Sequence, residues 1–176
     1  MKLGLCGTMS VGKTTLVNAL KETKQFKDYN FATERSQHLM SLGIPLNTDS
    51  TLKGQTVFLA ERCGELMQDN IITDRTIIDV MAFTMNAKSI PYQDKESFET
   101  YANEFIREYD YIFYISPHGI EIEDNGVRET DEHYRDLIDF TITTLIKRYG
   151  HKCNIVEKIS GSTEERIQQI LNITGL

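Results

Sequence analysis

The sequence predicts an α/β fold in which helices cover both faces of a parallel β-sheet. Strand-like and helix-like segments alternate along the whole chain, which is the pattern of such three-layer folds. Residues 111–115 (YIFYI) are nearly all apolar, as expected of a central strand that is buried on both faces. No internal repeat divides the 176 residues, so we expect one domain over residues 1–176.

The strand predictions rest on short apolar runs that are bounded by turn residues. In chain order, they are residues 2–6, 29–33, 70–73, 111–115 and 154–156.

The helix predictions rest on apolar residues that recur at helical spacing. In chain order, they are residues 14–22, 36–68, 79–87, 95–108, 131–149 and a last helix from Thr163. We expect Gly43-Ile44-Pro45 to break the second helix into two pieces, because proline cannot continue a helix. At Thr163-Glu164-Glu165-Arg166 we expect Thr163 to cap the start of the last helix.

Composition and charge exclude several function classes. The formal net charge is −7, whereas a non-specific binder of nucleic acid polymers needs a basic face. No apolar run is long enough to span a membrane, and the first strand leaves no room for a signal peptide. The three cysteines lack metal-site spacing and indicate reduced thiols. We therefore expect a cytoplasmic protein that binds neither membranes nor nucleic acid polymers.

The stretch Gly7-Thr8-Met9-Ser10-Val11-Gly12-Lys13-Thr14 matches G-x-x-x-x-G-K-[ST], the phosphate-binding P-loop. It lies between the first predicted strand and the first predicted helix, where its chemistry requires it. Gly7 and Gly12 let backbone N–H groups turn toward phosphate oxygens, and the helix adds free N–H groups at its positive end. We expect Lys13, as a partly exposed loop residue, to contact the β- and γ-phosphates and Thr14 to bind Mg²⁺.

Charged pairs follow two neighbouring strands, at the edge where open parallel sheets bind ligands. They are Glu34-Arg35 and Asp74-Arg75. Phosphoryl transfer needs a carboxylate to hold Mg²⁺ or to orient and deprotonate the acceptor, and arginines to balance charge. The alternatives are a structural salt bridge for Asp74-Arg75, a favourable helix N-terminal charge for Glu34 and a solvated helix face for Arg35.

Three further side chains are candidates for the same site. Arg128 lies in the polar segment 121–130 and has the place of a lid arginine or of an exposed loop residue. Phe58 and Arg62 are four residues apart on one predicted helix face, where they would stack on and bond an acceptor. A core phenylalanine beside an exposed arginine is the alternative.

Together these motifs resemble the P-loop nucleotide kinases of the thymidylate kinase-like group, the deoxynucleoside kinases and the small nicotinamide riboside kinase-like P-loop ATPases. The resemblance is carried by the P-loop, Glu34-Arg35-Ser36, Phe58-Leu59-Ala60-Glu61-Arg62 and Asp74-Arg75-Thr76. It implies a P-loop NTPase three-layer αβα sandwich with a five-stranded parallel sheet in the order 2-3-1-4-5. It also implies a lid at about residues 118–130 and an adenine-binding turn at Ser160-Gly161-Ser162. Many thymidylate kinases have an acidic P-loop residue, which this chain lacks.

The interpretation that follows is ATP- and Mg²⁺-dependent phosphoryl transfer to a (deoxy)nucleoside monophosphate. The site residues expected for the donor nucleotide are Gly7, Ser10, Val11, Gly12, Lys13, Thr14, Thr15 and Gly161. Those expected for the acceptor are Glu34, Arg35, Phe58, Arg62 and Arg75. Those expected for catalysis are Lys13, Glu34, Asp74, Arg75 and Arg128, with Thr14 and Asp74 as metal ligands. Thymidylate kinase-like proteins often dimerise, so the resemblance adds a homodimer to these expectations.

Two other interpretations stay open. A nucleoside or nicotinamide riboside kinase would use Glu34 as the base for a 5′-hydroxyl acceptor. A P-loop NTPase without a small-molecule acceptor is less favoured, since the chain lacks the N-K-x-D stretch of small GTPases. It also lacks the strand ending in Asp-Glu that AAA-type motors carry, because residues 111–115 are followed by Ser116-Pro117.

Overall fold

The computed structural model describes residues 1–33, 35–120 and 131–176. Its strands form one five-stranded sheet in the order β2-β3-β1-β4-β5, and every neighbouring pair is parallel. The strands are β1 (Lys2–Cys6), β2 (Asn30–Ala32), β3 (Ile71–Thr73), β4 (Tyr111–Ile115) and β5 (Ile155–Ile159). The predicted fold class and the strand order implied by the resemblance are both confirmed.

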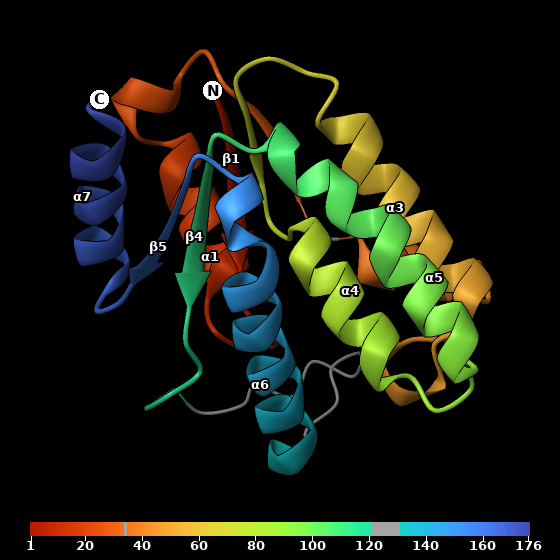
Figure 1. The fold of residues 1–176 in the computed structure, drawn as a ribbon. Coiled ribbons are helices and arrows are strands. Elements are labelled where there is room, and N and C mark those ends of the chain that lie inside the picture. Colours follow the sequence, from red (N-terminus) through yellow and green to blue (C-terminus); the bar gives the residue numbers. More distant parts are fainter. Residues whose placement is uncertain (34, 121–130) are drawn as a thin grey trace.

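Helices cover the two faces of this sheet. They are α1 (Lys13–Lys21), α2 (Ser36–Ser41), α3 (Leu52–Glu65), α4 (Ile77–Asn86), α5 (Tyr92–Ala102), α6 (Glu132–Tyr149) and α7 (Thr163–Thr174). Short 3₁₀ turns lie at η1 (Lys24–Phe26), η2 (Asn47–Asp49), η3 (Asn103–Glu108) and η4 (Gly150–Lys152). Figure 1 shows α7 at one side of the molecule and α3, α4 and α5 at the other. Among the described helices, none combines the length and apolar character needed to cross a lipid bilayer.

The alternation of side chains along β4 divides the core into two layers. Ile112 and Tyr114 belong to a buried cluster with residues of α3, α4, α5 and α6. Phe113 and Ile115 belong to a second cluster with residues of α1 and α7. Because both faces of β4 are covered, its nearly continuous apolar sequence is explained.

Several predicted helix boundaries are wrong, and each has a local cause. The first helix begins at Lys13, because Gly12 at φ +82° ends the loop one residue earlier than predicted. The helix α4 begins at Ile77, since the Thr76 side chain caps it in a capping box with Asp79. The cap of the last helix is Ser162, which forms a capping box with Glu165, and Thr163 is the first residue of the helix.

Two other segments differ from the prediction. The stretch predicted as one helix over 95–108 is α5 from Tyr92 to Ala102 followed by the 3₁₀ turn η3. The helical stretch predicted over 36–68 breaks near Gly43-Ile44-Pro45 as expected, but the break extends to Thr51, which caps α3. That longer connection contains η2, which lies beside the site described below.

Candidate active site

The P-loop joins β1 to α1 at the carboxyl edge of the sheet. Gly7 has φ +154°, and a Cβ there would lie 2.5 Å from the backbone oxygen of Ile115, so the sheet itself demands glycine at this position. Ser10 and Gly12 also have positive φ, at 58° and 82°. These conformations curl the backbone into the concave shape that binds anions.

Lys13 is buried at the centre of the loop, with 7% of its surface exposed. Its Nζ donates hydrogen bonds to the backbone oxygens of Gly7 and Thr8, the second at 2.7 Å. The prediction of a partly exposed loop lysine is therefore wrong, because the loop folds around its own lysine. Burial lowers the pKa of Lys13, and the nearby carboxylates of Asp79 and Asp74 oppose that shift.

Thr14 and Asp74 meet although they are sixty residues apart in the chain. The Thr14 hydroxyl donates to Asp74 Oδ2 at 2.7 Å, and Asp74, which follows β3, is 1% exposed. A hydroxyl and a carboxylate are oxygen ligands of the kind Mg²⁺ prefers. Within the described ranges no group of three or more His, Cys, Asp or Glu side chains gathers as a metal cage. This pair fits Mg²⁺, which proteins usually hold through one or two carboxylates together with substrate phosphates.

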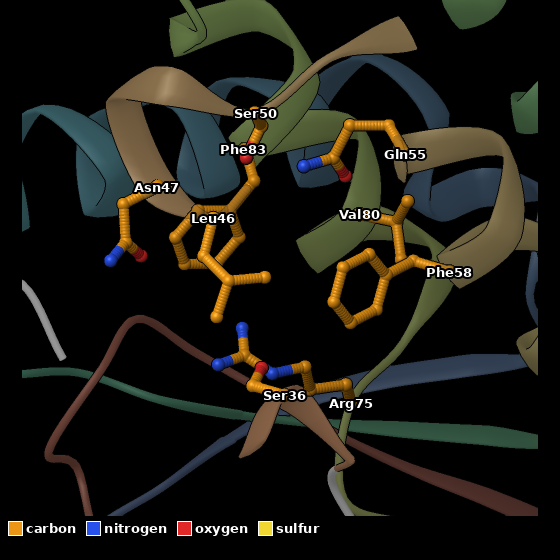
Figure 2. A pocket seen from close by; sticks show the side chains of 9 residues that line it. All are labelled: Ser36, Leu46, Asn47, Ser50, Gln55, Phe58, Arg75, Val80 and Phe83. Carbon is orange, nitrogen blue, oxygen red and sulfur yellow. The ribbon is translucent and has the colours of Figure 1, made fainter. Parts of the chain in front are cut away.

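A cavity lies next to the P-loop, and Figure 2 shows its lining. It is formed by Ser36, Leu46, Asn47, Ser50, Gln55, Phe58, Arg75, Val80 and Phe83. The empty volume is about 340 Å³, part of it open to solvent. The guanidinium carbon of Arg75 lies 4.9 Å from the centre of the Phe83 ring, which is the geometry of a cation–π contact.

The cavity opens into a larger cleft over the P-loop. Arg75 and Phe83 line both spaces, and the cleft also has Lys13, Thr14 and Asp74 in its wall. A molecule in the cavity would therefore have one end facing the phosphate-binding loop.

Another pocket adjoins the other side of the P-loop, toward α7. Its lining includes Ser10, Val11, Gly12, Thr14, Thr15, Gly161 and Arg166. The Arg166 Nη1 donates to the backbone oxygen of Val11 at 2.8 Å. The residues predicted to hold the donor nucleotide thus lie around one continuous loop, with Gly161 on the facing turn.

The predicted acceptor residues do not all lie together. Phe58 lines the cavity, and Arg35 lines the cleft with its Nη1 3.2 Å from Glu61 Oε1. Arg62 is 2% exposed and is absent from the lining of both spaces, and its Nη2 donates to Glu65 Oε1 at 2.5 Å. It is neither an exposed residue nor a wall of the cavity.

Two predicted site residues, Glu34 and Arg128, lie outside the described residues, as does most of the expected lid.

The structure also adds residues that the sequence analysis did not single out. Gln55 is 4% exposed and stands three residues before Phe58 on α3. Asn47 and Ser50 reach the cavity from the connection around η2. Asp79 is fully buried against the P-loop. The only local signal for Asp79 is the pattern of Thr76 followed three residues later by an acid.

Several solved structures have the same fold, and kinases are among them. One is deoxyadenosine kinase from M. mycoides with products dCMP and a flexible dCDP bound: the TM-score is 0.72 at 17% identity, covering 99% of this chain and 98% of that one. Another is NadR in complex with NR, with a TM-score of 0.73 at 17% identity over 99% of this chain and 52% of NadR. YorR from Bacillus subtilis, in complex with phosphorylated GDP, gives 0.63 at 16% identity over 100% and 96% of the two chains.

At these identities the likeness concerns the fold, and for the fold it confirms the resemblance to P-loop nucleotide kinases. A search of curated protein sequences gives no significant match. A family model described as an AAA domain matches residues 2–166. By that match over most of its length, this chain belongs to the AAA domain family of P-loop proteins.

Proposed function

We propose that this protein is an ATP- and Mg²⁺-dependent kinase whose acceptor is a (deoxy)nucleoside or its monophosphate. The strongest support is the cavity next to the P-loop, which opens into the P-loop cleft where Arg75 and Phe83 line both spaces. A kinase must hold two substrates with the transferred group between them, whereas an NTPase that uses water needs no second cavity. The kinase fold of the solved neighbours agrees with this proposal.

The lining of the cavity suits a nucleobase. The rings of Phe58 and Phe83 offer apolar, planar surfaces, and the Gln55 amide points between them in Figure 2. An amide carries both donors and an acceptor, so it can bond a base edge that presents both.

Phosphoryl transfer would take place where the cavity meets the P-loop. The donor phosphates bind the loop N–H groups, and Lys13 turns from the backbone oxygens of Gly7 and Thr8 to phosphate oxygens. Mg²⁺, when bound by Thr14 and Asp74, neutralises charge on the phosphates. Arg75 faces the acceptor end of the cleft, where its charge stabilises the moving phosphoryl group.

In the transfer step, an acceptor oxygen forms a bond to the γ-phosphorus. The bond from that phosphorus to the β,γ-bridging oxygen breaks, and ADP leaves with the electron pair. A phosphate acceptor attacks through an oxygen that is already ionised. A hydroxyl acceptor must lose its proton to a base, and we propose Glu34 for that role because it comes two residues after the last residue of β2 in the sequence.

The two acceptors differ in the positive charge they need. A monophosphate requires cations beyond those for ATP, and both Arg35 and Arg75 line the cleft. The Arg35 guanidinium, however, already pairs with the Glu61 carboxylate at 3.2 Å. This pairing favours an unphosphorylated nucleoside, while the monophosphate predicted from the sequence remains the second candidate.

The test is ATP consumption with Mg²⁺ against each deoxynucleoside, each deoxynucleoside monophosphate, nicotinamide riboside and its mononucleotide. We expect one nucleoside or monophosphate to raise turnover well above the background. The variant Val80→Phe tests whether the cavity holds the acceptor, because the larger side chain would fill the cavity from α4, away from the P-loop residues. It should abolish acceptor-dependent turnover while AMP-PNP still binds. Equal ATP consumption with and without every acceptor would reject the kinase and favour an NTPase.

A further inference from the structure

Asp79 is a buried carboxylate that the proposed chemistry does not use. It is the third residue of α4 and has no exposed surface. Acidic side chains are common in the first turn of a helix, where they favour its positive end, but they are almost never fully buried unless paired. Burying a carboxylate is costly unless its oxygens accept hydrogen bonds, so the partners of Asp79 indicate its role.

The two carboxylate oxygens of Asp79 bond to different parts of the chain. Oδ2 accepts from the N–H of Thr76 at 2.8 Å and from the Thr76 hydroxyl at 2.6 Å. Oδ1 accepts from the N–H of Gly7 at 3.0 Å. One rigid group therefore joins the N-terminus of α4 to the first residue of the P-loop.

The parts that Asp79 joins belong to the two halves of the site. On the donor side, the Gly7 carbonyl accepts a hydrogen bond from Lys13. On the acceptor side, α4 carries Val80 and Phe83, which line the cavity. A displacement of the P-loop at Gly7 thus acts on the first turn of α4 through a single side chain.

Capping alone does not require this second bond. In α7 a capping box of the same kind pairs Ser162 with Glu165, whose Oε2 accepts from the Ser162 N–H at 2.7 Å. That box is exposed, and its glutamate carboxylate bonds no other element within the described part of the chain. The bond from Gly7 to Asp79 is therefore an addition to the capping role.

We infer that Asp79 is a positioning residue that couples the P-loop to α4, so that nucleotide binding at the loop orders the wall of the acceptor cavity. The inference rests on the proposed function, because it takes the P-loop as the donor site and the cavity as the acceptor site. Coupling of this kind is a free energy shared by two sites, and it typically changes an equilibrium by about five- to 150-fold.

The test is hydrogen exchange of the full chain with and without AMP-PNP and Mg²⁺, followed in peptides from the P-loop and from residues 76–83. In the wild type, we expect nucleotide to slow exchange in both. Asp79→Asn keeps the side-chain shape but places an NH₂ group against one N–H donor. In this variant, nucleotide should still slow exchange in the P-loop peptide, whereas its slowing of exchange in the 76–83 peptide should be at least about fivefold smaller than in the wild type. Glu165→Gln is the matched control, and it should leave the α4 response intact.

If Asp79→Asn binds AMP-PNP and α4 still responds as in the wild type, the coupling is overturned. If the wild type binds AMP-PNP without any change in α4, the coupling is overturned as well and the donor site stands. If the wild type does not bind AMP-PNP, both the proposed function and the coupling fail. Thr76→Val, which removes one bond on the α4 side and keeps the Asp79 charge, should weaken the α4 response if Asp79→Asn does not fold.

Discussion

The substitution Gly7→Ala tests whether the sheet holds the P-loop in its observed shape. The added Cβ would lie 2.5 Å from the Ile115 backbone oxygen and 3.1 Å from Val11 Cγ2. Ile115 ends β4 and is paired with Ile159 of β5, so its carbonyl cannot move away without disturbing the sheet. A φ of +154° adds conformational strain of about 1–3 kcal/mol for any residue other than glycine. The overlap adds about 1–3 kcal/mol more, as overpacking does elsewhere.

We therefore expect Gly7→Ala to lower the free energy of unfolding by about 2–6 kcal/mol, out of the roughly 5–15 kcal/mol typical of a domain. Gly43→Ala is the matched control, because Gly43 has φ +80° and a Cβ added there would have no other atom within 4 Å. It should cost only the conformational strain, about 1–2 kcal/mol. Urea unfolding measures the loss of stability in both variants, from the shift of the unfolding midpoint at an unchanged m-value. If Gly7→Ala lowers the free energy of unfolding no more than Gly43→Ala does, the sheet does not hold the P-loop at Gly7 as argued.

Three more predictions concern the site and its surroundings. Lys13→Ala should lower phosphoryl transfer at least about hundredfold while circular dichroism shows an unchanged fold, and near-normal turnover would reject the P-loop assignment. Gln55→Leu should raise the acceptor KM about tenfold or more and leave the KM for ATP unchanged, and a reversed pattern would remove Gln55 from the acceptor site. Burial raises the pKa of Glu65 to about 7, against the attraction of Arg62. The folded state then binds a proton more tightly than the unfolded chain, so the free energy of unfolding should fall, by at most about 3 kcal/mol, as the pH rises from about 4.5 to 7. Urea unfolding of Glu65→Gln should lack that slope, and an unchanged slope would contradict the assignment to Glu65.

The parts of the site that could be predicted are those in which a short motif determines the local structure. The P-loop motif predicts a strand, a turn and a helix together, and the structure has all three around the residues from Gly7 to Thr15. Asp74 was identified because an acid after a strand end lies at the ligand-binding edge of a parallel sheet. Its bond to Thr14 follows from the pairing of β1 with β3.

The parts that could not be predicted depend on contacts between distant segments. The burial of Lys13 requires the loop to close over it, and the role of Asp79 requires α4 to begin at Ile77 beside the P-loop. Gln55 shares the cavity with Phe58, but its spacing on α3 alone does not distinguish a cavity wall from a polar surface position. Arg62 is the opposite case. Its helical spacing from Phe58 predicted that both would contact the acceptor, but the Arg62 guanidinium bonds to Glu65 and does not line the cavity.

The most direct test of the central claim is the fate of the γ-phosphoryl group. ATP labelled at the γ-phosphate is incubated with Mg²⁺, the wild-type protein and the nucleoside or monophosphate that most stimulates turnover, with Lys13→Ala in parallel. We expect the label to appear on the acceptor with the wild type and not with Lys13→Ala. Label released only as inorganic phosphate, at the same rate with and without acceptor, would contradict this expectation.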